Sequence, residues 1–145
     1  MRIEGTVSFM MSRVTTAFRN SLERNMSAVG LHSGQVFILF ELWKRDGQRQ
    51  VDLAGRLNVT TPTINKMLLG LIDAGLVDRV KLENDNRATR IFLTEAGASL
   101  KDPVEAQWHE LEENTVAGLT EAERLIMFEL LTKMKNLYTG EPDDD

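Results

Sequence analysis

Five polar residues with hydrogen-bonding side chains stand close together at the start of a predicted helix: Thr60, Thr61, Thr63, Asn65 and Lys66. Threonine hydroxyls can bind phosphates or base edges, an Asn amide can pair with an adenine edge at two points, and a Lys ammonium can meet guanine or phosphate. The N-terminus of a helix adds free backbone N–H groups that bind phosphate. These residue types favour contact with nucleic acid. The alternative is an ordinary solvated helix face.

A second polar group lies at the tip of a predicted β-hairpin. Two segments with alternating apolar residues, 77–82 and 88–93, are predicted to pair around a short polar turn. Arg87 at this tip can enter a narrow minor groove, where negative potential is concentrated, and Asn84 and Asn86 can bond sugar or phosphate. The alternative is a surface hairpin whose arginines serve solubility.

Three further basic residues, Arg79, Lys81 and Arg90, stand on the predicted strands away from the tip. Contact with nucleic acid and pairing with carboxylates are the two alternatives for them. Arg90 is included among the predicted contacts.

The segment before the hairpin predicts two helices joined by a tight turn. The first helix, Val51–Leu57, is followed by Asn58, which tolerates the left-handed conformation that ends a helix. Thr60 is the predicted N-cap of the second helix, and Pro62 falls in its first turn, where a missing N–H is harmless. Gly75 is predicted to end this helix. Two such helices followed by a hairpin indicate a winged helix-turn-helix.

Amphipathic helices are predicted on both sides of this core. One begins near Val7 with apolar residues at helical spacing, and another follows Ser33 and ends at the Asp46-Gly47 turn. A third follows Thr120, which forms a capping-box pattern with the glutamate three residues later. The fold class is therefore mainly α (α+β).

The connection between the hairpin and the last helix contains Pro103. One alternative is that Pro103 kinks a long helix. The other, which we favour, is that Asp102 caps a new helix, with Pro103 as its first residue and Glu105 as its capping-box partner.

Composition narrows the class of protein. A chain of 145 residues with 42% apolar content suits a single domain, 1–145. The absence of cysteine excludes disulfides and thiolate sites. The sequence contains no nucleophile-base pair, metal-ligand spacing or Gly-rich phosphate loop, so we expect no enzyme activity, no metal and no cofactor. It also contains neither a membrane-length apolar run nor a signal peptide, which predicts a cytoplasmic protein without a membrane partner.

The charge is unevenly distributed along the chain. The formal net charge is −5, but residues 1–93 hold 13 Lys/Arg against 9 Asp/Glu, whereas residues 94–145 hold 4 against 13. An acidic half that faces away from a polyanion does little harm to binding. Net acidity is therefore compatible with a nucleic-acid partner.

The run DLAGRLNVTTPTINKMLLGLIDAGLVDR followed by NDNRATRIFLTEAG resembles the winged helix-turn-helix core of the MarR family of bacterial transcription regulators. The matching features are a Leu-Ala-x-x-Leu helix, a Thr-Pro-Thr helix start, a Gly-Leu-Val-x-Arg exit, and an Asp-x-Arg ahead of Leu-Thr-x-x-Gly. The resemblance covers roughly residues 33–100. It departs from the family pattern at Gly55, Asn58 and Gly70, where the family often has a long charged residue, Gly and a basic residue, respectively.

The resemblance implies a homodimeric transcription regulator that binds double-stranded DNA. A helix of this regulator would bind in the major groove, and its hairpin, the wing, in the minor groove. By the resemblance, Asp85 and Arg87 occupy the Asp-x-Arg positions of the wing. Asp85 would hold the arginine of the wing in place, and Arg87 would enter the minor groove. The predicted DNA-binding set is Thr60, Thr61, Thr63, Asn65, Lys66, Asn84, Asp85, Asn86, Arg87 and Arg90.

The resemblance also implies a repressor that responds to a small amphipathic or aromatic effector, for which no binding residues are assigned. It divides the chain into a winged core at 33–100, dimerisation helices at 1–28 and 101–138, and a disordered acidic tail at 139–145. An excess of large apolar residues in the terminal helices independently favours a homodimer. A winged-helix module that binds protein instead of DNA is the alternative function.

Overall fold

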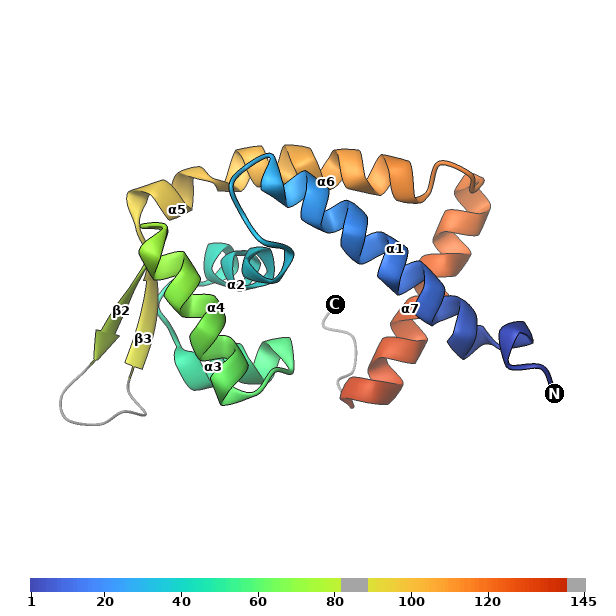
Figure 1. The fold of residues 1–145 in the computed structure, drawn as a ribbon, viewed down its shortest axis with the longest axis horizontal. Coiled ribbons are helices and arrows are strands. Elements are labelled where there is room, and N and C mark those ends of the chain that lie inside the picture. The colour runs from blue at the N-terminus through green and yellow to red at the C-terminus, as the bar shows by residue number, and fades with distance from the viewer. Residues whose placement is uncertain (82–88, 141–145) are drawn as a thin grey trace. The chain divides into compact units, whose positions relative to one another are not determined.

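The computed structural model describes residues 1–81 and 89–140, which form helices and one small sheet (Figure 1). The chain divides into two compact units, Met1–Leu111 and Glu112–Asp145, with α6 running from the first into the second. The elements are a 3-10 turn η1 (Ile3–Gly5), the helices α1 (Val7–Ser27), α2 (Ser33–Lys44), α3 (Gln50–Leu57), α4 (Thr61–Asp73), α5 (Glu95–Ser99), α6 (Lys101–Thr115) and α7 (Glu121–Thr139), and the strands β1 (Gln48–Arg49), β2 (Val77–Lys81) and β3 (Thr89–Leu93).

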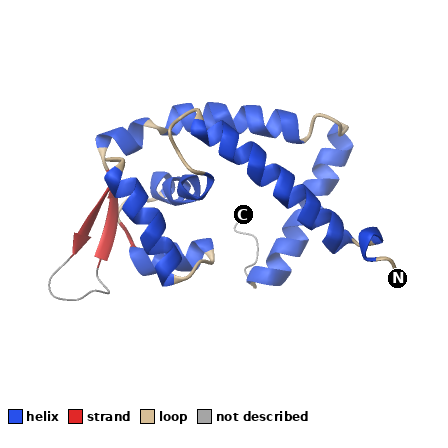
Figure 2. Ribbon diagram, in the orientation of Figure 1, coloured by secondary structure: helices blue, strands red, loops and turns tan. Residues whose placement is uncertain are grey.

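The three strands form one antiparallel sheet in the order β1-β3-β2, shown in red in Figure 2. Strands β2 and β3 pair from Val77 opposite Leu93 to Lys81 opposite Thr89, so the predicted hairpin is confirmed in the described residues. Its tip, residues 82–88, lies outside them. The short strand β1, which pairs Gln48 with Ile91, was not predicted from the sequence.

Helices α3 and α4 form the predicted helix-turn-helix. Asn58 ends α3 in the left-handed conformation, with φ 53° and ψ 47°. The Oγ1 atom of Thr60 accepts a hydrogen bond from the backbone N–H of Thr63 at 3.4 Å, which caps α4. Gly75, with φ 73°, follows the last residues of α4 as predicted. Local conformational preference and capping therefore define both ends of the turn.

The buried core of the first unit joins α1, α2, α3, α4, the sheet and the first part of α6. A polar contact also joins α1 to α6: Nδ2 of Asn25 donates to the backbone oxygen of Gln107 at 3.2 Å. The largest fully buried side chains are Leu22, Met26, Val36, Ile38, Leu39, Leu42, Leu53, Ile64, Leu68, Leu71, Val77 and Ile91. The core therefore fixes α4 against α2 and β2 (Figure 1), elements that the structure shows in contact.

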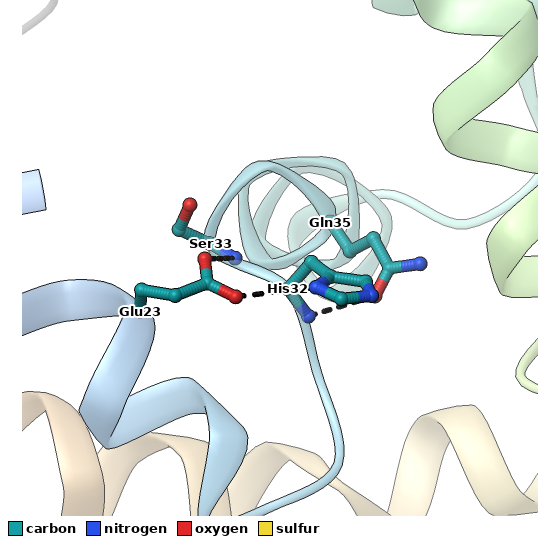
Figure 3. Close-up of polar contacts among 4 residues, drawn as sticks. All are labelled: Glu23, His32, Ser33 and Gln35. Atoms are coloured by element: carbon teal, nitrogen blue, oxygen red, sulfur yellow. Dashed lines mark hydrogen bonds and ion pairs between the residues drawn. The ribbon is translucent and has the colours of Figure 1, made fainter. Parts of the chain in front are cut away.

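A polar corner connects α1 to the start of α2 (Figure 3). One carboxylate oxygen of Glu23 accepts from the backbone N–H of Ser33 at 2.9 Å, and the other lies 3.1 Å from Nδ1 of His32. The backbone N–H of His32 donates to Oε1 of Gln35 at 3.0 Å. The bond from Ser33 is the main reason that the pKa of Glu23 falls below its ordinary value, with His32 contributing further.

The chain breaks between α5 and α6 at Leu100, so a single long helix is not formed. The expectation that Asp102 caps the second helix is wrong, because α6 begins at Lys101 and Asp102 lies in its first turn. Pro103 is tolerated there because the first N–H groups of a helix have no partner within it. Glu105 lies 4.0 Å from the ammonium of Lys101.

The second unit consists of the end of α6 and α7. Thr120 and Glu123 form the predicted capping box, and the pKa of Glu123 is lowered by its bond with the backbone of Thr120. Helix α7 has no buried residue and exposes large apolar side chains, among them Leu125, at 68%, and Phe128, at 76%. No helix among the described residues is long and apolar enough to span a membrane.

Candidate nucleic-acid interface

The outer face of α4 is polar in its N-terminal half. Thr61, Thr63 and Lys66 are exposed, and Asn65 is half-buried. Ile64, one residue before Asn65, points into the core, so the helical period turns Thr63, Asn65 and Lys66 away from it, while Thr61 is exposed at the start of the helix. Leu69, which is 46% exposed, is the only large apolar residue of α4 with such exposure. The face that the sequence predicted to bind nucleic acid is therefore accessible and polar.

The first turn of α4 carries two linked threonines. The Thr60 hydroxyl donates to Oγ1 of Thr63 at 3.0 Å and also accepts from the Thr63 N–H. The Thr60 oxygen is thus committed to capping the helix. Because the Thr63 hydroxyl only accepts in this pair, its own proton is free to bond an acceptor outside the protein.

Asn65 makes a bond that sequence reasoning missed. Its Oδ1 accepts from Nη2 of Arg79 on β2 at 3.0 Å. Strand alternation is the signal that could have indicated this, because Arg79 shares a face of β2 with the buried Val77, which packs toward the core. Alternation identifies the face, but the partner depends on where α4 packs.

Asn65 and Arg79 border a concave site of about 280 Å³ between the helix-turn-helix and the sheet. Gln50 of α3, Thr61 of α4 and Lys81 of β2 also line this site. It therefore brings together side chains from both parts of the motif. Of the predicted DNA-binding residues, Thr61 and Asn65 are in its lining.

Arg90 lies elsewhere. Its Nη1 donates to the backbone oxygen of Gly47 at 2.9 Å. Its neighbours on β3, Thr89 and Ile91, are buried, so alternation turns Arg90 to the other face of the sheet from Thr89, which lines the concave site. The remaining predicted wing residues, Asn84, Asp85, Asn86 and Arg87, fall outside the described part of the chain.

Positive charge near α4 is not neutralised by ion pairs within residues 1–81 and 89–140. No carboxylate of those residues lies within ion-pair distance of Lys66, Arg79 or Lys81. Pairing with a carboxylate, the alternative for Arg79 and Lys81, is therefore not seen there. At the start of α3, by contrast, Arg49 donates to Asp52 at 3.0 Å, which lowers the pKa of Asp52 and raises that of Arg49.

The surroundings of position 70 explain why a glycine suits it. A Cβ atom at this position would lie 2.6 Å from Nε2 of Gln35, the residue that bonds the N-terminus of α2. A glycine therefore leaves room for the end of the Gln35 side chain beside α4. The basic residue that the family often has here would meet Gln35.

The larger aromatic residues are packed against one another. Trp108 makes edge-to-face contacts with Phe18, Phe37 and Phe40 at ring-centroid distances of 5.2–6.3 Å. The indole N–H of Trp43 donates to the backbone oxygen of Gly97 at 3.0 Å. Both tryptophans thus belong to the packing around the core. No group of three or more potential metal-binding side chains is found in the described residues.

Together these features define a winged helix-turn-helix protein: a capped helix with a polar outer face, packed beside a hairpin and preceded by a second helix at a left-handed turn. The sequence profile of the MarR family matches residues 31–89. The regulator TtmR of Methylorubrum extorquens is 25% identical over 134 residues, covering 92% of this chain and 68% of TtmR.

Solved structures agree with the assignment. The MepR–DNA complex of S. aureus is 27% identical with a TM-score of 0.79, covering 90% of this chain and 97% of MepR. BpsR of Bordetella bronchiseptica, whose DNA binding is regulated by 6-hydroxynicotinic acid, has the same fold, with a TM-score of 0.84 at 20% identity over 94% of this chain and 97% of BpsR. Residues 31–89 thus match the model of the MarR family, and the fold is that of solved MarR-family transcriptional regulators.

Proposed function

We propose that this protein is a homodimeric, sequence-specific regulator of transcription that binds double-stranded DNA and acts as a ligand-responsive repressor. The observation that carries the proposal is the outer face of α4, whose capped N-terminal half presents hydroxyl, amide and ammonium groups. These are the groups that read base edges and phosphates in a major groove. Such a protein works in the cytoplasm, beside the DNA, and needs no catalytic activity.

On α4, Thr61, Thr63, Asn65 and Lys66 are the proposed contacts in the major groove. The backbone N–H of Thr61 at the helix start, next to Thr60, is suited to a phosphate. Arg79 and Lys81, without carboxylate partners in the described residues, add positive charge beside this face. The local field thus favours DNA despite the net charge of −5.

The wing is the proposed minor-groove reader. Strands β2 and β3 hold the hairpin beside α4, and Arg87 follows from the family resemblance as the residue that enters the groove, braced by Asp85. Asn84 and Asn86 are proposed to bond the backbone nearby. Arg90 contributes charge, with one guanidinium nitrogen already bonded to Gly47.

A homodimer is proposed because the terminal helices leave apolar surface uncovered. Leu125 and Phe128 of α7 and Val14 of α1 are all more than half exposed. A twofold interface through segments 1–28 and 101–138 would cover such surface and flank the winged core at 33–100. Two copies of α4 would then occupy successive major grooves, about 10 bp apart.

A small effector is proposed as the signal that releases DNA. The MepR–DNA complex supports DNA as a partner, and BpsR, regulated by 6-hydroxynicotinic acid, supports a small aromatic effector. The likeness to MepR is one of fold and sequence, and the likeness to BpsR is one of fold alone. The effector's binding residues are left unassigned.

Selection of binding sites from random duplexes tests the proposal. At low salt we expect enrichment of an inverted repeat whose half-site centres lie about 10 bp apart. Affinity for the selected duplex should fall steeply with added salt, because Lys and Arg displace counterions from the phosphates. Failure to enrich any sequence, with no binding to any duplex at low salt, would refute the proposed function.

A further inference from the structure

The bond between Arg79 and Asn65 fixes which end of the Asn65 amide faces Arg79. Oδ1 accepts from Nη2 of Arg79 at 3.0 Å. A guanidinium has only donors, so the amide cannot be reversed without placing two donors against each other. Nδ2 and its two N–H groups therefore point away from Arg79. This orientation follows from chemistry and needs no choice between the two amide ends.

Arg79 has reason to keep this bond. Its Nε is buried and has no hydrogen-bond partner among the described residues, and no carboxylate of those residues pairs with it. Losing Asn65 would leave a second donor of the same guanidinium unpaired, which is costly for a charged group. A bond from a cation is also stronger than one between neutral groups. The pair is thus a preformed unit that joins β2 to α4.

We propose that Arg79 is a positioning residue that makes Asn65 a hydrogen-bond donor toward the DNA, and that Asn65 consequently selects a base with acceptors in the major groove. The inference rests on the proposed function. Guanine presents two acceptors there, O6 and N7, which suit the two N–H groups of Asn65. Cytosine presents a donor and is disfavoured.

The sequence alone suggested that Asn65 pairs with an adenine edge at two points, whereas the bond to Arg79 favours guanine. A two-point bond to adenine requires Asn to accept from N6 and donate to N7 at once. Arg79 on β2 already occupies one of the two lone pairs of the Asn65 Oδ1 atom and places a cation beside it, so a second donor, adenine N6, is disfavoured at that oxygen. Guanine, which requires no acceptor from Asn65, is accordingly preferred over adenine.

The first experiment identifies the base pair that Asn65 reads. Dissociation constants are measured for the selected operator with each of the four bases at every half-site position, using the wild type and Asn65→Ala. The position read by Asn65 is the one whose preference the Ala variant abolishes. We expect guanine there, bound about tenfold more tightly than cytosine. Asn65→Asp, which can only accept, should reverse that order in favour of cytosine.

The second experiment tests the role of Arg79. In Arg79→Met the Asn65 amide is free to turn, so the preference for guanine over adenine at that position should fall about tenfold or invert. Lys81→Met is the matched control, because Lys81 lies two residues away on the same face of β2 and carries the same charge. It should weaken binding to all sequences alike and leave the preference intact.

The outcomes separate the two proposals. Adenine preferred at the position that Asn65 reads, or no position that depends on Asn65, would overturn the inference while DNA binding stands. An Arg79→Met variant that loses affinity uniformly, as Lys81→Met does, would overturn it too. If Arg79→Met does not fold, the Asn65→Asp reversal decides the question, since Asp keeps a partner for Arg79. A wild type that binds no duplex would refute the proposed function and this inference together.

Discussion

At the scale of single residues, Glu23 joins the end of α1 to the start of α2. Its pKa lies below the ordinary value of 4.5, chiefly because the Ser33 backbone N–H bonds the charged form. A carboxylate with a lowered folded-state pKa stabilises the fold above its unfolded pKa, and this contribution is lost as the pH falls through the folded value. The stabilisation should therefore be present at neutral pH and absent in strong acid.

Glu23→Gln tests this directly. We expect the variant to be less stable than the wild type at pH 7 by roughly 0.5 kcal/mol, because solvent screens a half-exposed carboxylate. The difference should shrink below about pH 4.5. Urea unfolding at several pH values measures it, with Glu110→Gln on the exposed face of α6 as the control. A difference of the same size at pH 7 and pH 3 would contradict the assignment.

Some residues of the candidate site could be predicted from the sequence and others could not. Thr60, Asn58 and Gly75 act through their own backbone conformation and near neighbours, so their types reveal their roles. The partners of Arg79 and Arg90 are remote in the sequence and depend on how α4 and β1 pack against the hairpin. Alternation along β2 and β3 predicts their faces but not those partners.

At the scale of elements, Gly97 and Gly70 both lie where an added Cβ atom would meet a neighbouring atom, but the neighbours differ. A Cβ at Gly97 in α5 would collide with the backbone oxygen of Leu76, which is held by a bond from the Thr94 N–H. A Cβ at Gly70 in α4 would meet only the end of the flexible Gln35 side chain. Backbone cannot move aside as a side-chain tip can. The two positions should therefore respond differently to the same substitution.

Gly97→Ala should lower the free energy of unfolding by about 1–3 kcal/mol, as overpacking does. Gly70→Ala should be nearly neutral, because about 1 kcal/mol of helix propensity offsets the displaced Gln35 bond. Urea midpoints of the two variants and the wild type measure both effects. Equal losses at the two positions would show that Gln35 is as rigid as backbone.

The elements themselves follow the sequence closely. Helical spacing and caps predict α1, α2, α3, α4 and α7, because these signals are local. Strand β1 is only two residues long and forms because Gln48 and Arg49 pair with β3, so no local sequence pattern predicts it. The start of α6 was misplaced because an Asp-Pro pair suits either an N-cap or a first turn.

At the scale of the whole molecule, the uncovered face of α7 should hold two copies of the chain together. Phe128→Glu would place a carboxylate in the apolar interface, where it has no partner. We expect the dimer dissociation constant to rise at least about tenfold, as measured by sedimentation equilibrium. Phe128 is 76% exposed within one chain, so the fold itself should be little affected.

Glu129→Gln serves as the control, because Glu129 is the next residue of α7 and, within the described part of the chain, pairs along its own helix, with Lys133 at 3.3 Å. It should remain dimeric. A wild type that sediments as a monomer would exclude this interface. If the dimer dissociation constant of Phe128→Glu equals that of the wild type, the dimer interface does not include Phe128.

Methylation interference on the selected operator tests the central claim, that α4 reads the major groove while the wing reads the minor groove. Guanine N7 lies in the major groove and adenine N3 in the minor groove. We expect N7 methylation to block binding at two places about 10 bp apart, and flanking N3 methylation to block the wild type but not Arg87→Ala. Binding that tolerates N7 methylation throughout the operator would contradict it.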